Sequence, residues 1–438
     1  MPFIRRISLT VLATALFSGS LSAQQANILT LQDAVHMALS GGTDARRARL
    51  SETRARIAEK EGLESMFPQG DLRLVQTNES INLQTFGFSI PGQPPVVGPF
   101  NVTDAQVSAA VQLFNLAALR HYQALRKGTE ASVAQLQRAR NDVINAVARL
   151  YVLVERADAQ SSSRQSEIDL FERLTRLSRD ELQAGTGTRL DVAQADLQLA
   201  RSRQALLVAK NDRQSALVAL LTSIGADQSS EVTLVAPLPV PGTAPSLEES
   251  LTRARNGRPE LQAARLMEAS AKLGVEAARD RQLPSLALDF AGDYSGNHPN
   301  ELLWSRRVSG VVSMPIFRPD LRANAARARV TLEESQINRE GVERGVEQQV
   351  RQASMSLENA QARMELAGGA ATVAEQALQI AREKQESGYG SSVEVDRAED
   401  SYRQAREDVI AARADAALAW YGLQYSTGTI GVLFEAGP

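Results

Sequence analysis

The side chains that could carry out chemistry are few in this sequence and widely spaced. His36, His121 and His298 lie far apart along the chain, which favours surface or packing roles over a shared site. Asp289 and Asp293 fall on one face of a predicted strand, because alternate residues of a strand point the same way. Lining of a polar surface explains this pair better than acid–base catalysis does. We therefore expect no enzymatic activity, no cofactor and no bound metal.

Two glycine-containing turns are the strongest local signals. The first, Gly185-Thr186-Gly187, resembles half of a dinucleotide-binding loop, but it follows a predicted helix where that loop would follow a strand. Glycines after a helix instead predict a reversal of the chain, and Thr188 with Asp191 forms a capping box that begins the next helix. The same device recurs 203 residues later. Its members are Gly388, Tyr389, Gly390, Ser391 and Glu394.

An internal repeat covers most of the chain. Residues 30–34 (TLQDA) open the first half and residues 246–250 (SLEES) open the second, and both are predicted capping boxes. We assign residues 24–228 to the first repeat and residues 246–438 to the second. Between them, residues 229–245 carry four prolines and are predicted to form an extended connector.

The N-terminus carries an export signal. Arg5 and Arg6 form a basic start, residues 7–17 are apolar but too short to span a membrane, and Leu21-Ser22-Ala23 is a plausible cleavage site. We therefore expect residues 1–23 to be a signal peptide. No later stretch reaches about 18 consecutive apolar residues, so we expect no membrane-spanning helix after it.

The composition excludes several classes of protein. The 438 residues carry a net charge of −3, which gives no support to nucleic-acid binding. No cysteine is present, so disulfides, thiolate metal sites and a cysteine-linked lipid anchor are excluded. Aromatic residues make up only 5% of the chain, which favours long helices that pack through small side chains over a globular core.

Each half is predicted to run helix, helix, strand, loop, strand, very long helix, long helix. Leu136, Val143 and Leu150 keep the seven-residue spacing of a coiled coil. The strands alternate apolar and polar residues, which suits an outer-membrane β-barrel but also an ordinary half-buried sheet. The predicted strands are about 71–78, 104–114, 285–295 and 307–317, and the predicted long helices are about 116–184, 189–224, 321–387 and 392–427.

Four strands cannot close a barrel alone. Open strand edges are forbidden in lipid, so a chain with membrane strands must oligomerise. A dimer would supply about eight strands and little lumen, whereas a trimer would supply about twelve and a pore.

The sequence resembles the TolC family of outer-membrane channels over the whole mature chain. The resemblance rests on the repeat, on Pro315-Ile316-Phe317 between the last strand and its long helix, and on two tips in which glycine precedes an acid by six residues. Gly185 with Asp191 and Gly388 with Glu394 meet that pattern. The resemblance implies a mainly α fold with a membrane β part: a homotrimer with a twelve-stranded β-barrel in outer-membrane lipid and a periplasmic α-barrel of antiparallel coiled-coil helices.

The resemblance also implies partners and a function. A channel of this family is the passive exit duct of a tripartite efflux pump or a type I secretion system, and it docks to a periplasmic adaptor and an inner-membrane transporter. The two tips would then carry the adaptor contact. A periplasmic coiled-coil adaptor is the alternative, but such a protein would carry one hairpin between lipoyl-like halves.

Family members narrow the periplasmic entrance with acids near the second tip. Glu394 occupies the first of these positions, whereas the second is Arg397 here, which argues against a double acidic ring. Asp191 is the equivalent acid of the first repeat. The tyrosine and arginine that latch the second tip in the family fall at Gln385 and Gly390, so Arg189 and Tyr389 are the remaining latch candidates.

Overall fold

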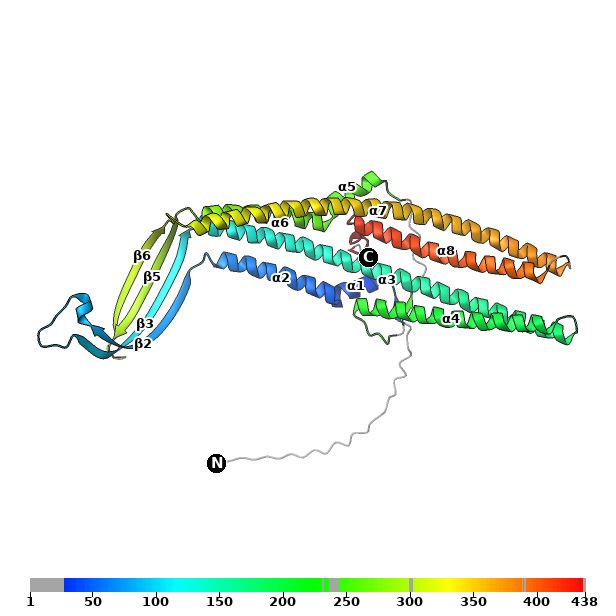
Figure 1. The fold of residues 1–438 in the computed structure, drawn as a ribbon, viewed down its shortest axis with the longest axis horizontal. Helices are drawn as coiled ribbons and strands as arrows, with labels where there is room; N and C mark the ends of the chain where they lie inside the picture. Colours follow the sequence, from blue (N-terminus) through cyan, green and yellow to red (C-terminus); the bar gives the residue numbers. More distant parts are fainter. Residues whose placement is uncertain are drawn as a thin grey trace, which may run out of the picture.

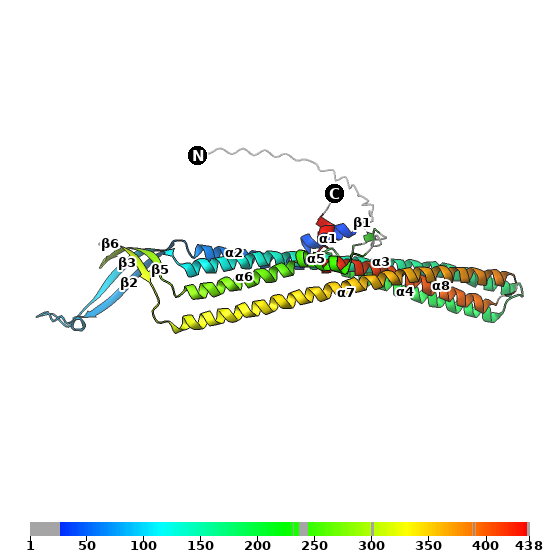
Figure 2. The same cartoon turned by 90° about the horizontal axis from the view of Figure 1, so that it is seen from above.

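The computed structural model describes residues 27–230, 232–235, 244–298, 302–387, 389 and 391–435. The predicted signal peptide, most prolines of the predicted connector, and Gly388 and Gly390 of the second tip lie outside the described residues. The molecule is an elongated rod, with a four-stranded sheet at one end and two helical hairpin tips at the other (Figures 1 and 2). The predicted fold class, mainly α with a β part, is confirmed.

Sixteen elements make up the described part of the chain. In order they are β1 (Asn27–Leu29), α1 (Leu31–Gly41), α2 (Thr43–Glu64), β2 (Gln69–Asn82), the 3-10 helix η1 (Leu83–Phe86), β3 (Val96–Phe114), α3 (Leu116–Gln183), α4 (Arg189–Ile224), β4 (Val232–Leu234), α5 (Leu247–Gly257), α6 (Pro259–Asp280), β5 (Ser285–Gly296), β6 (Leu303–Ser313), α7 (Pro319–Glu386), α8 (Ser392–Ser426) and α9 (Val432–Glu435).

The long helices begin where local capping groups satisfy their first N–H groups. Asn115 accepts a hydrogen bond from the N–H of Ala118 at the start of α3, and Pro319 occupies the first turn of α7, where no N–H is needed. Each of these two helices has 68 residues, which corresponds to about 100 Å. They are the two rods on which the other elements are arranged.

The strands differ from the predicted ranges at their ends. β2 and β3 run past residues 71–78 and 104–114 toward their shared loop, because the backbone ladder continues after apolar alternation stops. Asn78 and Asn101 are paired there and share a side-chain hydrogen bond of 2.8 Å. β6 ends at Ser313 and not at residue 317, because Pro315 has no N–H to donate to a ladder.

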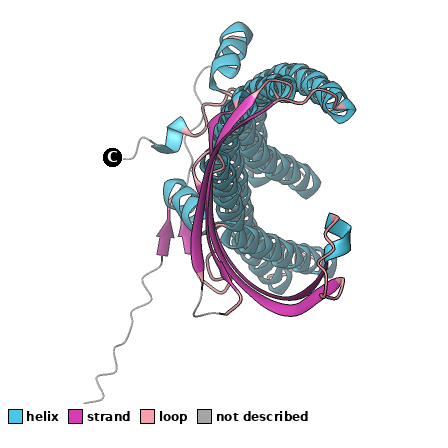
Figure 3. Ribbon diagram, turned by 90° about the vertical axis from the view of Figure 1, so that its left-hand side faces the viewer, coloured by secondary structure: helices cyan, strands magenta, loops and turns pink. Residues whose placement is uncertain are grey.

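The strands form two separate sheets. The four-stranded sheet is antiparallel in the order β2-β3-β5-β6, so β3 and β5 join the two repeats. The second sheet is the short parallel pair of β1 and β4. Figure 3, viewed from the sheet end, shows the four-stranded sheet and the helices behind it curving in the same direction.

The two repeats pack their helices in an interleaved order. α6 packs extensively against both α3 and α7, and so does α8. Their counterparts in the first repeat, α2 and α4, pack against α3 but make no comparable contact with α7 within the described residues. In that same part of the chain, no helix is both long enough and apolar enough to cross a membrane.

The main core lies midway along the rod, where α1, α3, α4 and the end of α8 meet. Tyr151 is fully buried at its centre. Its hydroxyl lies 3.0 Å from the carbonyl oxygens of both Leu29 and Val235 and accepts a hydrogen bond from the N–H of Val235 at 3.1 Å. The side chain therefore fastens both strands of the small sheet to α3, and burial raises its pKa to about 12.

Candidate functional site

The register of the four-stranded sheet gives it one mainly apolar face, which also carries Arg306 opposite Gly292, and one mainly polar face. Residues directly opposite each other in antiparallel strands lie on the same face. Leu72 pairs with Val107, Ala109 with Phe290, and Phe290 with Val308. The large side chains of this face are exposed in the single chain, Leu72 at 69% and Val308 at 64%. The apolar face is therefore a surface without a partner inside the described part of the chain.

An aromatic pair lies near the outer end of the apolar face. Tyr294 is opposite Trp304, and their ring centroids are 4.8 Å apart. The indole lies directly over Gly292, where an added Cβ would come within 2.0 Å of the ring, so only glycine leaves room for it. Aromatic residues at the end of an apolar band are typical of the water–lipid boundary of outer-membrane barrels.

The opposite face of the sheet is polar and more crowded. Arg73 pairs with Gln106, Gln106 with Asp293, and Asp293 with Ser305. The Oδ1 atoms of Asp104 and Asp293 are inaccessible to solvent and have no hydrogen-bond partner among the described residues. Asp289 is also on this face, opposite Ser309. The alternation of the sequence predicted that polar residues would gather on one side of the strands. The pairing register places them on one face of the sheet.

The first tip has the geometry of a tightly capped reversal. Gly185 adopts φ = +77°, a left-handed conformation that favours glycine. Thr188 accepts from the N–H of Asp191, and the Asp191 carboxylate accepts from the N–H of Thr188 at 2.8 Å, so the predicted capping box is present. These hydrogen bonds from Thr188 lower the pKa of the Asp191 carboxyl group. Thr186 and Gly187 both donate their N–H groups to the carbonyl oxygen of Glu181.

The second tip is capped less completely. Ser391 accepts from the N–H of Glu394 at 3.3 Å, but the Glu394 carboxylate does not return to Ser391. The predicted reciprocal capping box is therefore wrong here, and the Glu394 side chain is free to project from the first turn of α8. Arg397 is exposed one turn further on. Tyr389, 91% exposed, is the most prominent described side chain of this turn.

One ion pair crosses each hairpin at an equivalent position near the tip. Arg179 of α3 binds Asp196 of α4 at 2.7 Å, and Arg382 of α7 binds Glu399 of α8 at 2.8 Å. Both members of the second pair lie 203 residues after those of the first. The sequence reasoning missed these contacts, although the repeat offset marks both of them. They hold the two helices of each hairpin together just above the tip.

A second cluster of charges joins the two hairpins to each other. Arg164 of α3 contacts Glu407 of α8 at 2.5 Å, and Arg403 of α8 contacts Glu167 of α3 at 3.1 Å. Glu167 also contacts Arg164 at 3.0 Å, and its side chain is only 10% exposed. We call these four residues the inter-hairpin cluster. No ion pair or hydrogen bond across the hairpins is found for Arg189 or Tyr389 among the described residues, and their role as latch residues stays a prediction.

Both long edges of the protomer carry exposed apolar residues at coiled-coil spacing. All of these residues are more than half exposed, and a seven-residue spacing keeps each run on one side of its helix. The edge stripe of α7 consists of Val330, Ile337, Leu366, Val373 and Ile380. The opposite edge stripe consists of Leu50 and Ile57 on α2 and Leu190 and Leu197 on α4.

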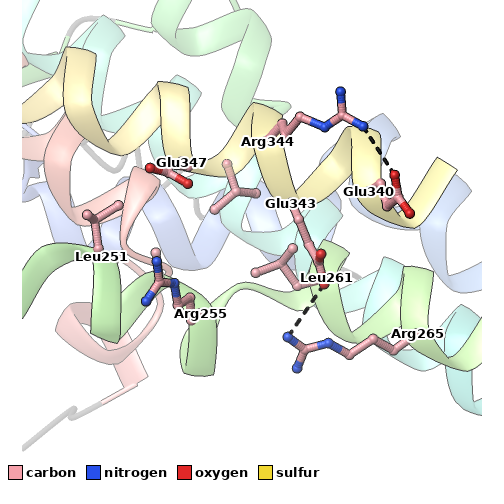
Figure 4. Close-up of a pocket in the computed structure, with 10 residues that line it drawn as sticks. Leu251, Arg255, Leu261, Arg265, Glu340, Glu343, Arg344 and Glu347 are labelled. Carbon is pink, nitrogen blue, oxygen red and sulfur yellow. Dashed lines mark hydrogen bonds and ion pairs between the residues drawn. The ribbon is translucent and has the colours of Figure 1, made fainter. Parts of the chain in front are cut away.

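A cleft of about 410 Å³ lies between α5, α6 and α7. Leu251, Leu261 and Val346 form its apolar floor. Figure 4 shows charged residues around its rim, with ion pairs between Arg265 and Glu343 and between Arg344 and Glu340. Four of the charged residues that line the cleft are therefore paired with each other.

The chain belongs to the outer membrane efflux protein family. The family model described as "Outer membrane efflux protein" matches residues 98–226 and 251–429, which are parts of both repeats. The protein is therefore an outer-membrane efflux channel with a periplasmic extension, and the channels of this family are not enzymes. The alternative of a periplasmic adaptor receives no support.

Solved outer-membrane channels share the fold. The Campylobacter jejuni channel CmeC is 18% identical, with a TM-score of 0.76 and coverage of 91% of this chain and 85% of that one. The Neisseria gonorrhoeae channel MtrE, in its open state, is 19% identical, with a TM-score of 0.75 and coverage of 98% and 97%. CusC is 17% identical, with a TM-score of 0.79 and coverage of 98% and 99%. No curated protein sequence matched the chain.

Proposed function

We propose that three copies of this chain form one continuous duct across the outer membrane and the periplasm. The observation that carries the proposal is the match between the two edge stripes. α6 and α8 each pack against both of the 68-residue helices, α3 and α7. Within the described structure, α2 and α4 pack extensively against α3 alone of these two helices, which leaves their other sides free. The α7 stripe of one copy therefore fits the free sides of α2 and α4 of the next, and the ring closes.

The sheet supports the same assembly. β2 and β6 are the edge strands, each with an unpaired side in the described sheet. Pairing β6 of one copy with β2 of the next satisfies these edges, as lipid requires. Three copies then give about twelve strands, with the apolar face toward lipid and the polar face with Asp289 and Asp293 toward the lumen.

The hairpin tips are proposed to bind the periplasmic adaptor, which links the duct to an inner-membrane transporter. Both tips lie at the end of the rod opposite the sheet (Figure 1). In the first tip, Gly185 and Thr186 are exposed and Gly187 is partly exposed. In the second, Gly388 and Gly390 flank the exposed Tyr389 in the sequence. The duct supplies no energy, so the transporter must drive the cargo, and drugs, metal ions and secreted polypeptides all fit a duct of this design.

Glu394 is proposed to form the charged part of the periplasmic entrance. Its carboxylate has no partner in its own cap, and three-fold symmetry would place three such groups around the axis. Arg397 lies close enough in sequence to pair with it and reduce the negative field. Asp191 has its carboxylate engaged with Thr188, so it serves the cap of α4.

Two experiments test this proposal. The mass of the channel extracted from outer membranes should correspond to three chains, and a stable monomer would contradict the assembly. In planar bilayers, Glu394→Gln should lower cation preference and Arg397→Ala should raise it, because the mutations remove opposite charges. Asp191→Gln should change selectivity much less. Equal selectivity in all three variants would place the entrance charge elsewhere.

A further inference from the structure

The outer boundary of the sheet can be read from its register. Leu74 pairs with Ala105, Ala105 with Tyr294, and Tyr294 with Trp304, so these residues form one row across all four strands. The aromatic pair at the end of this row is typical of the lipid–water boundary. Whatever extends beyond the row therefore lies outside the membrane.

A two-stranded ribbon does extend beyond it. β2 continues to Asn82 and β3 begins at Val96, whereas β5 pairs with β3 only as far as Thr103. No Asp, Glu, Lys or Arg occurs between residues 80 and 103, although charged residues make up 23% of the chain. Instead the ribbon exposes apolar side chains to about half of their surface or more. They are Phe86, Phe88, Ile90 and Val96.

The ribbon is bent by a built-in irregularity. The pairing register shifts between Glu79 and Ile81, and such bulges bend a strand and increase its twist. Gly98 lies opposite the shift with φ = +109°, and an added Cβ would come within 2.8 Å of the Glu79 carbonyl oxygen. Figure 3 shows the end of the sheet, with its short helical turn, on the concave side. The ribbon thus leans toward the interior of the curve.

The ribbon is long enough to cross the mouth of the duct. Twelve strands spaced about 4.8 Å apart and tilted by about 40° enclose a radius of roughly 12 Å. Beyond the register shift, residues 80–82 and 96–101 provide roughly 10–20 Å of strand, and residues 83–95 extend this reach to the axis. An uncharged surface allows three copies to meet at the axis without electrostatic repulsion, and exposed apolar patches of this kind mark contact surfaces.

We propose that the three ribbons, residues 80–101 of each copy, contact one another over the outer mouth and form an uncharged lid. This inference rests on the proposed trimer. The apolar surface of each ribbon would pack against the same ribbon of a second copy. The lid would restrict the inward passage of ions and large solutes from outside, at the end of the duct opposite the charged entrance.

Crosslinking tests the contact directly, because the chain has no cysteine of its own. Phe88→Cys should give disulfide-linked dimers on mild oxidation of outer membranes, since a disulfide needs Cα atoms within about 7 Å. Ser295→Cys, on the rim of the barrel, should give none. If the Phe88→Cys variant is a trimer by native mass but forms no disulfide-linked dimer, the lid is overturned, whereas loss of the trimer would overturn the proposed assembly instead.

A second measurement separates the lid from binding to the outer leaflet. A fluorophore attached to the thiol of the Phe88→Cys variant should not be quenched by brominated lipids, and strong quenching would overturn the lid. Replacement of residues 79–100 by Asn-Gly, which joins Asn78 to Asn101 through a two-residue turn, should raise single-channel conductance severalfold. Gln93→Ser, a polar change in the same loop, should leave it unchanged. Equal conductance of the shortened and full-length trimers would also refute the lid.

Discussion

The inter-hairpin cluster should control how far the two hairpin tips of one chain separate. The double variant Arg164→Gln, Arg403→Gln removes both cations that bridge α3 and α8 in the cluster, the contacts of 2.5 Å to Glu407 and 3.1 Å to Glu167. Glutamine keeps most of the side-chain length and the helix propensity. The change is therefore mainly a loss of charge pairing.

The size of the effect follows from the exposure of the groups. Fully exposed ion pairs contribute little, about 0–1 kcal/mol, but these side chains are between 10% and 38% exposed. We take about 1 kcal/mol for each bridging contact, or about 2 kcal/mol together. Since about 1.4 kcal/mol is tenfold in an equilibrium constant, the ratio of separated to joined tips should rise about 30-fold.

Distances between spin labels at the two tips measure this ratio. Cysteines introduced at Thr186 and Tyr389 provide the labels, and a small fraction of labelled chains mixed with unlabelled chains restricts the signal to one protomer. The double variant should shift the distribution to longer distances. Arg344→Gln breaks a highly exposed pair with Glu340 within α7 and serves as the matched control. An identical distribution for wild type and double variant would refute the role assigned to the cluster.

Three further predictions address other parts of the chain. Val373→Asp places a charge in the proposed seam between copies, where an unpaired charge costs roughly 3–5 kcal/mol; native mass measurement should show loss of the trimer. Gly185→Val strains a left-handed position by about 1–2 kcal/mol; export should fall while the trimer persists in the membrane, and unchanged export would argue against tip docking. Burial raises the pKa of Tyr151, Tyr421 and Tyr425 to about 12 from 10.0. As the pH rises, the unfolded chain loses these protons before the folded chain does, so the stability that they contribute should be complete below about pH 10 and fall between about pH 10 and 12. Thermal unfolding measured across that range should show a falling melting temperature.

Local signals predicted the helices well because their caps are local. The start of α4 at Arg189 follows from Thr188 and Asp191, which contact each other within one turn. The second tip shows the limit of such reasoning. Ser391 and Glu394 have the same spacing, yet the Glu394 carboxylate does not return to its cap. A motif specifies which contacts are possible, whereas the tertiary surroundings decide which of them form.

The buried side of α3 could not be predicted from its heptads. The row of Leu136, Val143 and Leu150 is only partly buried, whereas Ile144 and Tyr151, also seven residues apart, are almost completely buried. α3 contacts α2, α4, α6 and α8, so more than one side of the helix is covered. A single sequence with several apolar rows does not reveal which row meets which neighbour.

Contacts between the hairpins were beyond sequence reasoning for a related reason. Arg164 and Glu407 are 243 positions apart, and each is one of many charged residues on a polar helix. By contrast, the contact of Arg179 with Asp196 has a counterpart at the repeat offset, and a search for charge pairs preserved at 203 residues would have found it. The duplication therefore allows the two repeats of one chain to be compared for shared charge pairs, as related proteins are usually compared.

The position of the main core makes α3 a lever. Tyr151 lies about 32 residues before the end of α3, or about 50 Å from the tip. A tilt of about 5° at this fulcrum would displace the tip by roughly 4 Å, which exceeds the length of the ion pairs that join the hairpins. Small changes in packing around the parallel pair of short strands are therefore amplified at the periplasmic end. Substitutions near Tyr151 should alter the aperture at the tips without touching any residue that lines it.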